Sequence, residues 1–351
     1  MTTAMSPARL IPAGLAIVAA TYGLARYTYG LFVPDIQQDL GVSTATLGVI
    51  ASGSYAGYLV ATVFGSAISG VVGPRLPVIL GGLAAALGMA MMALAEDVTL
   101  FACGVILAGT SPGLAYPPLS DAVMRLIAEP RQNRTYAVIN SGTSVGVILA
   151  APAALLAASD WRMAWMGFAI FAAVATVWNA FLMPSGGYRC RHGTALPSLH
   201  WRWFLGESST RLFTAAAVFG IATAVYWTFA VDLLVRAGGM AENQSRLFWL
   251  LIGAAGLLGG AAGDLVRRIG LRRTFRSGVT AVTLAIAVPA IWPEATGLAY
   301  VSGLVFGAGF ILVTGLFGIW SVHVFHDRPS AGFGATFFLI SGGQLVGPAL
   351  A

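Results

Sequence analysis

One arginine lies deep inside a long apolar stretch, and its chemistry needs an explanation. Arg26 precedes Pro34 by about eight residues, roughly 12 Å along a helix. Tyr22, Arg26 and Tyr29 have the spacing i, i+4, i+7, which predicts that they share one helical face. A guanidinium offers two parallel donors to an anion. We expect Arg26 to bind an anion; the alternative is a structural arginine bonded to backbone carbonyls or an internal acid.

Other apolar stretches carry aromatic and amide groups that could complete a pocket around such an anion. Buried amides need partners, so Asn140 and Gln344 either line this pocket or bond one helix to another. The tyrosines and tryptophans also suit the interfacial belts of a membrane protein. The further candidates of this kind are Tyr58, Tyr116, Trp227 and Trp320. The predicted binding residues are Arg26, Tyr22, Tyr29, Tyr55, Asn140, Tyr226 and Gln344.

The acidic residues lie near the ends of the apolar stretches. Asp35 and Asp232 are the two candidates for proton coupling; the alternative is that both are solvated residues at helix ends. His323, His326 and Asp327 have a spacing that allows two metal ligands on one face, but no third or fourth ligand follows. We therefore expect no metal site and no cofactor. No catalytic cluster is evident, so an enzyme is not expected.

Composition excludes several classes of protein. The 351 residues are 58% hydrophobic and only 9% charged, whereas a soluble domain carries about 25% charged residues. A soluble enzyme, a nucleic-acid binder and a disordered chain are thereby excluded. All 19 basic residues are arginines, which removes any chemistry that needs a lysine. With two cysteines, Cys103 and Cys190, no disulfide framework is available.

Apolar stretches long enough to cross a membrane recur along the whole chain. The first continues past Arg26 without a clear cleavage site, so we interpret it as a retained helix and not as a signal peptide. The predicted spans are 11–33, 47–70, 76–95, 99–120, 135–158, 161–183, 211–233, 246–266, 276–293, 296–320 and 333–351.

The arginines are distributed unevenly between the two sides of these spans. Fifteen fall on the side of the N-terminus, whereas the other side holds only Arg162, Arg236 and Arg246. Cytoplasmic loops are rich in basic residues, so the N-terminus is predicted to be cytoplasmic. The net charge of +6 therefore reflects membrane topology. The basic cluster at 267–276 is expected to contact anionic lipid, not nucleic acid.

An internal repeat divides the chain into two halves. The segment 22–25 (YGLA) resembles 219–222 (FGIA), and the same offset of 197 pairs Gly73 with Gly270 and Arg75 with Arg272. Between the halves lies the longest polar segment. We predict an N-terminal bundle over 1–183, a cytoplasmic linker over 184–210 and a C-terminal bundle over 211–351.

One loop carries a recognisable motif. The segment 263–273 (GDLVRRIGLRR) resembles the signature G-x-L-x-D-R-x-G-x-R-R of the major facilitator superfamily, with Arg267 in place of the acid. The copy at 66–75 is degenerate. In this family an acid near the inner end of helix four often closes a charge latch, which would be Asp121 here, with Arg75 as its partner. The resemblance therefore implies gating roles for Arg75, Asp121, Gly263, Arg267, Gly270 and Arg272.

Helices one and two, at 25–30 (ARYTYG) and 50–59 (IASGSYAGYL), are similar to the bacterial YbfB-like branch of that family. The resemblance implies an all-α membrane fold of two pseudo-symmetric six-helix bundles around a central cavity. Family members have twelve helices, whereas this sequence stops at 347–351 (GPALA), inside the eleventh. We expect a truncated product or an incomplete sequence; the alternative is a genuine eleven-helix protein.

Together these features predict a secondary transporter of the inner membrane that moves a small organic anion by alternating access. Its expected partners are the substrate and the lipid bilayer, with protons as the candidate coupling ion. No nucleic acid is expected, and the protein is expected to be a monomer. The alternatives are a drug or metabolite exporter, a non-functional truncated transporter, and a membrane enzyme or sensor.

Overall fold

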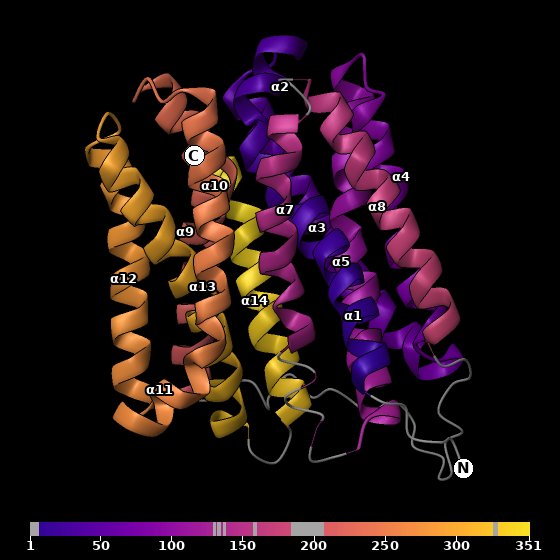
Figure 1. Ribbon diagram of the computed structural model, residues 1–351. Coiled ribbons are helices and arrows are strands. Elements are labelled where there is room, and N and C mark those ends of the chain that lie inside the picture. Colours follow the sequence, from indigo (N-terminus) through magenta and orange to yellow (C-terminus); the bar gives the residue numbers. More distant parts are fainter. Residues whose placement is uncertain are drawn as a thin grey trace.

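The computed structural model describes residues 7–128, 131, 135, 138–156, 160–183, 207–325 and 329–351, and it is helical with no strand in these residues. The long helices run side by side between two ends of the molecule (Figure 1). The predicted all-α fold is therefore confirmed. In chain order, the segments are α1 (Pro7–Val18), η1 (Ala19–Tyr27), η2 (Thr28–Phe32), α2 (Val33–Leu40), α3 (Thr44–Val72), α4 (Arg75–Ala93), α5 (Val98–Leu126), α7 (Gly142–Leu156), α8 (Trp161–Leu182), α9 (Glu207–Arg236), α10 (Glu242–Gly256), η4 (Leu257–Ala261), α11 (Ala262–Ile269), α12 (Leu271–Ile291), α13 (Thr296–Val324) and α14 (Pro329–Leu350).

Short polar side chains start several of these helices. The Oγ of Ser43 accepts a hydrogen bond from the backbone N–H of Thr46 at 3.1 Å. Asp97 accepts two, from the N–H groups of Thr99 and Leu100, and Asp160 accepts one at the start of α8. Such caps satisfy N–H groups that the first helical turn leaves free. These three residues therefore determine where α3, α5 and α8 begin.

The structure revises two of the predicted spans. Within the described residues, nine helical segments are long and apolar enough to cross a membrane. The first runs from Arg9 to Leu40, seven residues beyond the predicted end. The predicted span 246–266 is not one helix, because α10 ends at Gly256 and the 3₁₀ segment η4 separates it from α11. A Cβ on Gly259 would lie 2.5 Å from the Cβ of Ile311, so this glycine allows η4 to lie directly on α13.

The two copies of the repeat share backbone conformations at matched glycines. Gly73 and Gly270 have φ of 90° and 83°. Gly73 precedes α4 by one intervening residue, Gly270 directly precedes α12, and both helices carry an arginine in their first turn. Gly41 and Gly239 have φ of 63° and 64°. These values lie in the left-handed region that favours glycine. Most of the predicted linker, residues 184–206, lies outside the described residues, and α9 begins at Glu207.

Helices from the two proposed halves pack against each other at several places. Within the first half α5 packs against α3 and α4, and α4 packs against α8. Within the second, α9 packs against α14 and α12 against α13. Between the halves, α14 contacts α3, α10 contacts α7 and α9 contacts η2. The interface thus includes the segment η1–η2 that carries Arg26.

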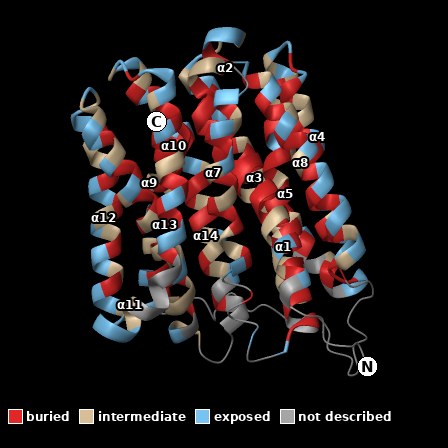
Figure 2. Ribbon diagram, viewed as in Figure 1, coloured by how far each residue is buried: buried red, intermediate tan, exposed pale blue. Residues whose placement is uncertain are grey.

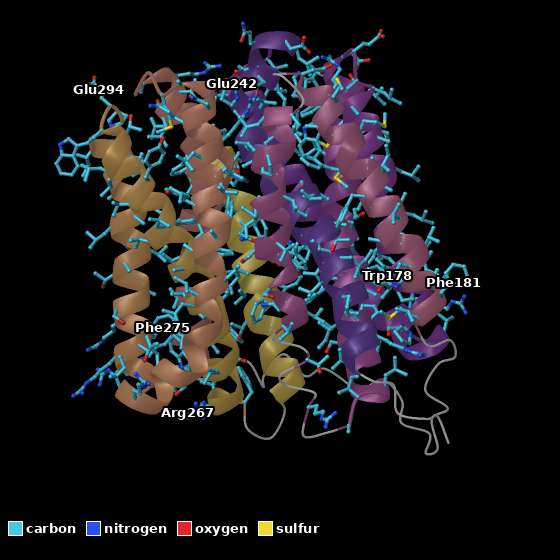
Figure 3. All side chains as sticks on the ribbon, viewed as in Figure 1. Trp178, Phe181, Glu242, Arg267, Phe275 and Glu294 are labelled. Atoms are coloured by element: carbon cyan, nitrogen blue, oxygen red, sulfur yellow. The ribbon has the colours of Figure 1, made fainter. Side chains whose placement is uncertain are left out.

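The burial pattern suits a molecule surrounded by lipid. Buried residues follow the inner faces of the helices, and exposed residues follow the outer faces (Figure 2). Large apolar side chains are among the exposed ones, including Phe181 at 81% and Leu87 at 58%. Figure 3 shows Trp178 and Phe181 on the outward side of α8. An apolar outer face of this extent is unfavourable in water and favourable in a bilayer.

Candidate functional site

Arg26 lies in the helical segment η1 and is only 6% exposed. Its Nη2 donates a hydrogen bond of 2.7 Å to Oε1 of Gln344, a residue of α14 that is 2% exposed. This bond joins residues 318 positions apart in the chain. We expected Gln344 either to line the pocket or to bond one helix to another. In the structure it forms a bond between helices, from Arg26 of η1 to Gln344 of α14.

Four tyrosine rings surround the guanidinium of Arg26. Its Cζ lies 3.8 Å from the ring centroid of Tyr58 and 4.8 Å from that of Tyr55. Tyr27 and Tyr22 follow at 5.6 and 5.7 Å. A cation over an aromatic face is stabilised by about 0.5–2 kcal/mol, and the upper value applies to desolvated pairs. The ring faces therefore replace part of the hydration that Arg26 gives up.

The helix around Arg26 is not an α-helix, and this corrects one prediction. Residues 19–27 form a π-helix, with its i→i+5 bonding extended by the bond from the N–H of Thr28 to the carbonyl of Gly23. The rings of Tyr22 and Tyr27, five residues apart, accordingly stack with centroids 6.3 Å apart. Of the expected i, i+4, i+7 set, Tyr22 contacts the guanidinium of Arg26 and Tyr29 lines the same small cavity as Arg26, although the segment between them is not α-helical. The hydroxyl of Tyr29 donates to the carbonyl of Leu47 at 3.0 Å.

A close contact with α7 accompanies this π-helix. A Cβ on Gly23 would lie 2.5 Å from Cα of Gly146 and 2.7 Å from the carbonyl oxygen of Thr143. Only a residue without a side chain fits there. Gly146 of α7 is as closely packed against η1. The pair allows the backbones of η1 and α7 to touch beside Arg26.

A chain of aromatic and polar groups leads from Arg26 to Asn140. The hydroxyls of Tyr22 and Tyr58 are 3.0 Å apart and share a hydrogen bond. The ring of Tyr22 meets that of Tyr116 edge-on at 5.2 Å. Tyr116 donates a hydrogen bond of 2.5 Å to Oδ1 of Asn140. The predicted residue Asn140 therefore reaches the site only through Tyr116 and Tyr22.

Tyr226 lies on the far side of the site from this chain. Its hydroxyl shares a hydrogen bond of 2.6 Å with Oγ of Ser302, and its ring stacks on Phe306 with centroids 3.9 Å apart. Its neighbours Trp227 and Thr228 line the small cavity at Arg26, and the ring of Trp227 lies 4.7 Å from that of Tyr27. Tyr226 thus serves the packing of α9 against α13.

The cavity at Arg26 is very small in this structure. Its volume is about 10 Å³, roughly the room of one water molecule. Both proposed halves line it. The lining residues are Ala25, Arg26, Tyr29, Ala51, Ser54, Tyr55, Val105, Trp227 and Thr228.

A larger cavity, of about 210 Å³, is lined in part by Glu242, which lies at the upper end of the molecule in Figure 3. Asp35 of α2 and Glu242 and Arg246 of α10 contribute charges to its wall. Arg246 is ion-paired with Glu242, and its side chain is 8% exposed. The half-buried Asp35 therefore lines a cavity to which both proposed halves contribute charged residues.

Asp232, the other candidate for proton coupling, is held in an ion pair. It lies 2.7 Å from Nε of Arg236, one turn further along α9, and is 6% exposed. Arg236 also donates a hydrogen bond to the side chain of Gln37 on α2. Arg236 therefore ties α9 to α2 across the two proposed halves.

The residues with predicted gating roles lie at the opposite end. Ser69 donates a hydrogen bond of 2.7 Å to Oδ2 of Asp121, joining α3 to α5. Arg75 is exposed, and no ion pair in the described part of the chain joins it to Asp121. Gly263 and Arg267 lie in α11, Gly270 precedes α12, and Arg272 is exposed in its first turn. Asp121 therefore accepts a hydrogen bond from Ser69, whereas we expected it to pair with Arg75.

Metal-ligand residues do not gather in the part of the chain that the structure describes. No group of three or more histidines, cysteines or acids with metal-site geometry occurs there. His323 is exposed, and its Nδ1 lies 2.8 Å from the carbonyl oxygen of Ile319. His326 and Asp327 lie outside the described residues.

Sequence reasoning missed Tyr27 and gave too little weight to Tyr58. Both touch the guanidinium of Arg26, and Tyr58 does so most closely. An α-helical period places Tyr27 away from the face of Tyr22, so the residue spacing concealed it. Tyr58 follows Tyr55 by three residues on α3. This i, i+3 pair was the available signal for a ring pair on one face.

Residues 15–348 match the family model of the Major Facilitator Superfamily. The chain is 27% identical to the transcription regulatory protein OpdE of Pseudomonas aeruginosa, covering 91% of this chain and 81% of that protein. It is also 27% identical to a chloramphenicol resistance protein of Streptomyces lividans, over 81% of this chain and 72% of the relative. A hexuronate transporter of Bacillus subtilis is 23% identical, with 93% and 83% covered.

Solved structures share the fold at lower sequence identity. The structure of a D-xylose–proton symporter superposes with a TM-score of 0.76 at 14% identity, covering 98% of this chain and 89% of that one. This likeness concerns the fold alone. With a family match over almost the whole chain, apolar membrane-length helices and the same helical arrangement, the protein is a multi-pass membrane protein of the Major Facilitator Superfamily.

Proposed function

We propose that this protein is a secondary transporter that carries a small organic anion bound at Arg26. The observation that supports the proposal is the charge of Arg26, which is buried among neutral side chains: Gln344 and four tyrosine rings. None of the ion pairs among the described residues includes Arg26. Burial of an uncompensated charge is costly. An anionic substrate would supply the countercharge.

The character of the surrounding side chains and one relative fit this substrate class. An anion with an apolar or aromatic body suits a guanidinium ringed by tyrosines. The Bacillus relative is a hexuronate transporter, and a hexuronate is a sugar that carries a carboxylate. A carboxylate matches the paired donors of arginine better than a cation or a neutral group does.

The proposed mechanism is alternating access by two bundles, 1–183 and 211–351, with the segment 184–210 between them. The arginine distribution supports an orientation in the inner membrane with a cytoplasmic N-terminus. On this arrangement, the end with Asp121, Gly263, Arg267, Gly270 and Arg272 is the cytoplasmic gate. The proposed transporter works as a monomer, since one chain supplies both sides of the site at Arg26.

Uptake into proteoliposomes tests the proposal. We expect the native protein to take up benzoate or glucuronate, and Arg26→Gln to reduce uptake at least about tenfold, since a lost charged hydrogen bond is worth roughly 1.5–3 kcal/mol. Arg273→Gln, which neutralises an exposed arginine of α12, is the matched control. Normal uptake by Arg26→Gln would refute the role of Arg26.

Proton coupling is proposed for the acids at the Glu242 end. Asp35 faces the larger cavity and Asp232 pairs with Arg236. We expect Asp35→Asn or Asp232→Asn to abolish uptake driven by a pH gradient while exchange of substrate across the membrane continues. Asp39→Asn removes an acid of the same helix α2 and is the control. Gradient-driven uptake that survives both replacements would refute coupling through these residues.

A drug exporter is the second candidate, and one observation favours it. The chain is 27% identical to a chloramphenicol resistance protein, and rings dominate the wall of the site at Arg26. An exporter would move unrelated cationic or neutral compounds. If the native protein and Arg26→Gln transport such compounds equally well, the exporter displaces the anion transporter and Arg26 becomes structural.

A further inference from the structure

The donors of Arg26 are only half used along one edge of its guanidinium. In arginine, the N–H of Nε and one N–H of Nη2 point in the same direction and form a fork. Here Nη2 donates to Oε1 of Gln344 at 2.7 Å. The Nε of the same fork is buried and has no hydrogen-bond partner within the described residues. Of the two nitrogens that form this fork, one therefore bonds a protein side chain and the other is unsatisfied.

A carboxylate would fill this fork better than the amide of Gln344 does. The amide offers one neutral oxygen, whereas a carboxylate offers two oxygens and a negative charge. Bidentate arginine–carboxylate bonds are roughly twice as strong as neutral hydrogen bonds. A buried donor left without a partner costs free energy that a bidentate ligand recovers. Gln344 therefore bonds Arg26 more weakly than a carboxylate would.

The Arg26–Gln344 bond also joins the two proposed halves. Arg26 lies on η1 of the first half, and Gln344 lies on α14, which packs against α9 of the second half and α3 of the first. Both residues are almost fully buried, and the cavity beside them has the volume of about one water molecule. A ligand can take both donors of this fork only if the side chain of Gln344 moves away.

We propose that Gln344 is an internal competitor of the substrate. In the empty transporter it holds the Arg26 fork and closes the two halves together. A substrate carboxylate takes both donors, releases Gln344 and frees α14 to move. The inference rests on the proposed function, because it requires that Arg26 binds an anion. It adds that the side chain of Gln344 lowers substrate affinity when it holds the two halves together.

Two substitutions at Gln344 test the proposal in opposite directions. Gln344→Leu keeps the side-chain volume and removes the oxygen, so benzoate should bind roughly tenfold more tightly than to the native protein. Gln344→Glu places a carboxylate on Arg26, so the melting temperature without ligand should rise and benzoate should lose its effect. Gln244→Glu is the matched control, because Gln244 caps α10 at Ala241, outside the Arg26 site. Ligand-induced shifts of the melting temperature in detergent measure benzoate binding by the native protein and the three variants. Benzamide serves as the neutral isostere.

The outcomes separate this inference from the proposed function. We expect Gln344→Leu to bind benzoate more tightly and Gln344→Glu not to bind it. The control should bind it as the native protein does. If both Gln344 variants bind benzoate as the native protein does, while Arg26→Gln abolishes binding, Gln344 is not a competitor. The anion site at Arg26 is then still supported. A native protein that responds to neither benzoate nor glucuronate, or to benzamide as strongly as to benzoate, overturns both. If Gln344→Leu fails to fold, Gln344→Glu alone decides the question.

Discussion

At the scale of single residues, the ring of Tyr58 is the strongest neutral support of the Arg26 charge. It lies 3.8 Å from the guanidinium, and its hydroxyl bonds Tyr22 at 3.0 Å. These two contacts can be removed separately. Tyr58→Phe removes the hydroxyl bond and should destabilise the protein by about 1 kcal/mol. Tyr58→Leu removes the ring as well and should cost roughly 2 kcal/mol more.

Thermal unfolding in detergent measures the difference as a fall in melting temperature that is clearly larger for Tyr58→Leu. The ring contact also predicts weaker anion binding in Tyr58→Leu, because the guanidinium loses the support that orients it. Tyr300→Phe and Tyr300→Leu, at a partly buried tyrosine of α13, provide the control pair. Equal melting temperatures for Tyr58→Phe and Tyr58→Leu would show that the ring contributes nothing.

At the scale of elements, the sequence predicted the helices well and their internal irregularities poorly. Apart from the end of the first span and the broken span 246–266, long apolar runs place the membrane-length segments to within a few residues, since hydrophobicity decides where a chain crosses a bilayer. The π-helix around Arg26 and the break at η4 left no mark in that pattern. Both depend on tertiary contacts through glycines, Gly23 with Gly146 and Gly259 with Ile311. Helical periodicity therefore selected Tyr29 and overlooked Tyr27.

The contact between η1 and α7 predicts a sharp difference between two glycines. A Cβ on Gly23 would collide with the backbone of Gly146 and Thr143, so Gly23→Ala should destabilise the protein by about 1–3 kcal/mol or more. It should also weaken anion binding, since η1 holds Arg26. Gly167 of α8 is exposed, and a Cβ added there would meet nothing within 4 Å.

Gly167→Ala is accordingly the control and should stabilise α8 by up to about 1 kcal/mol. Melting temperatures of the two variants, each against the native protein, make the comparison. Tolerance of Gly23→Ala without loss of stability or binding would mean that the close approach of η1 and α7 does not matter.

The tie between α2 and α9 predicts a change in the access of reagents to the larger cavity. Arg236 bonds Gln37 on α2 and Asp232 on its own helix. Arg236→Gln should therefore favour the state open at this end, by a factor of about 5–30 for the loss of 1–2 kcal/mol. Ser245, which lines the cavity and is 4% exposed, reports on access as Ser245→Cys.

The measurement is the rate at which an impermeant maleimide labels that cysteine. Arg162→Gln is the matched control, because Arg162 bonds Asp39 and the carbonyl of Ala95, all within the first proposed half. That variant should lose stability without faster labelling. Equal labelling rates in Arg236→Gln and Arg162→Gln would contradict a gate formed by Arg236.

At the scale of the whole molecule, charge and burial give the protein two unlike ends and an apolar circumference. Glu242 and Glu294 lie at one end, and Arg267 lies at the other (Figure 3). The sequence predicted this polarity from the arginines alone, because basic residues remain on the cytoplasmic side of a membrane. What it could not predict is how the halves touch. The Arg26–Gln344 bond spans 318 residues, and no local pattern links two positions so far apart.

The orientation of these two ends gives the last prediction. If the end with Arg267 is cytoplasmic, a cysteine at Glu294, on the exposed turn before α13, should react with an impermeant maleimide in intact cells. A cysteine at Arg273, exposed at the start of α12, should react only after the membrane is permeabilised. Both reporters are placed in a background with Cys103→Ala and Cys190→Ala, which removes the native thiols. The two positions lie at opposite ends of α12 and its following turn, so one membrane crossing separates them. Labelling of Arg273→Cys in intact cells, with protection of Glu294→Cys, would invert the topology and move the proposed cytoplasmic gate to the outer face.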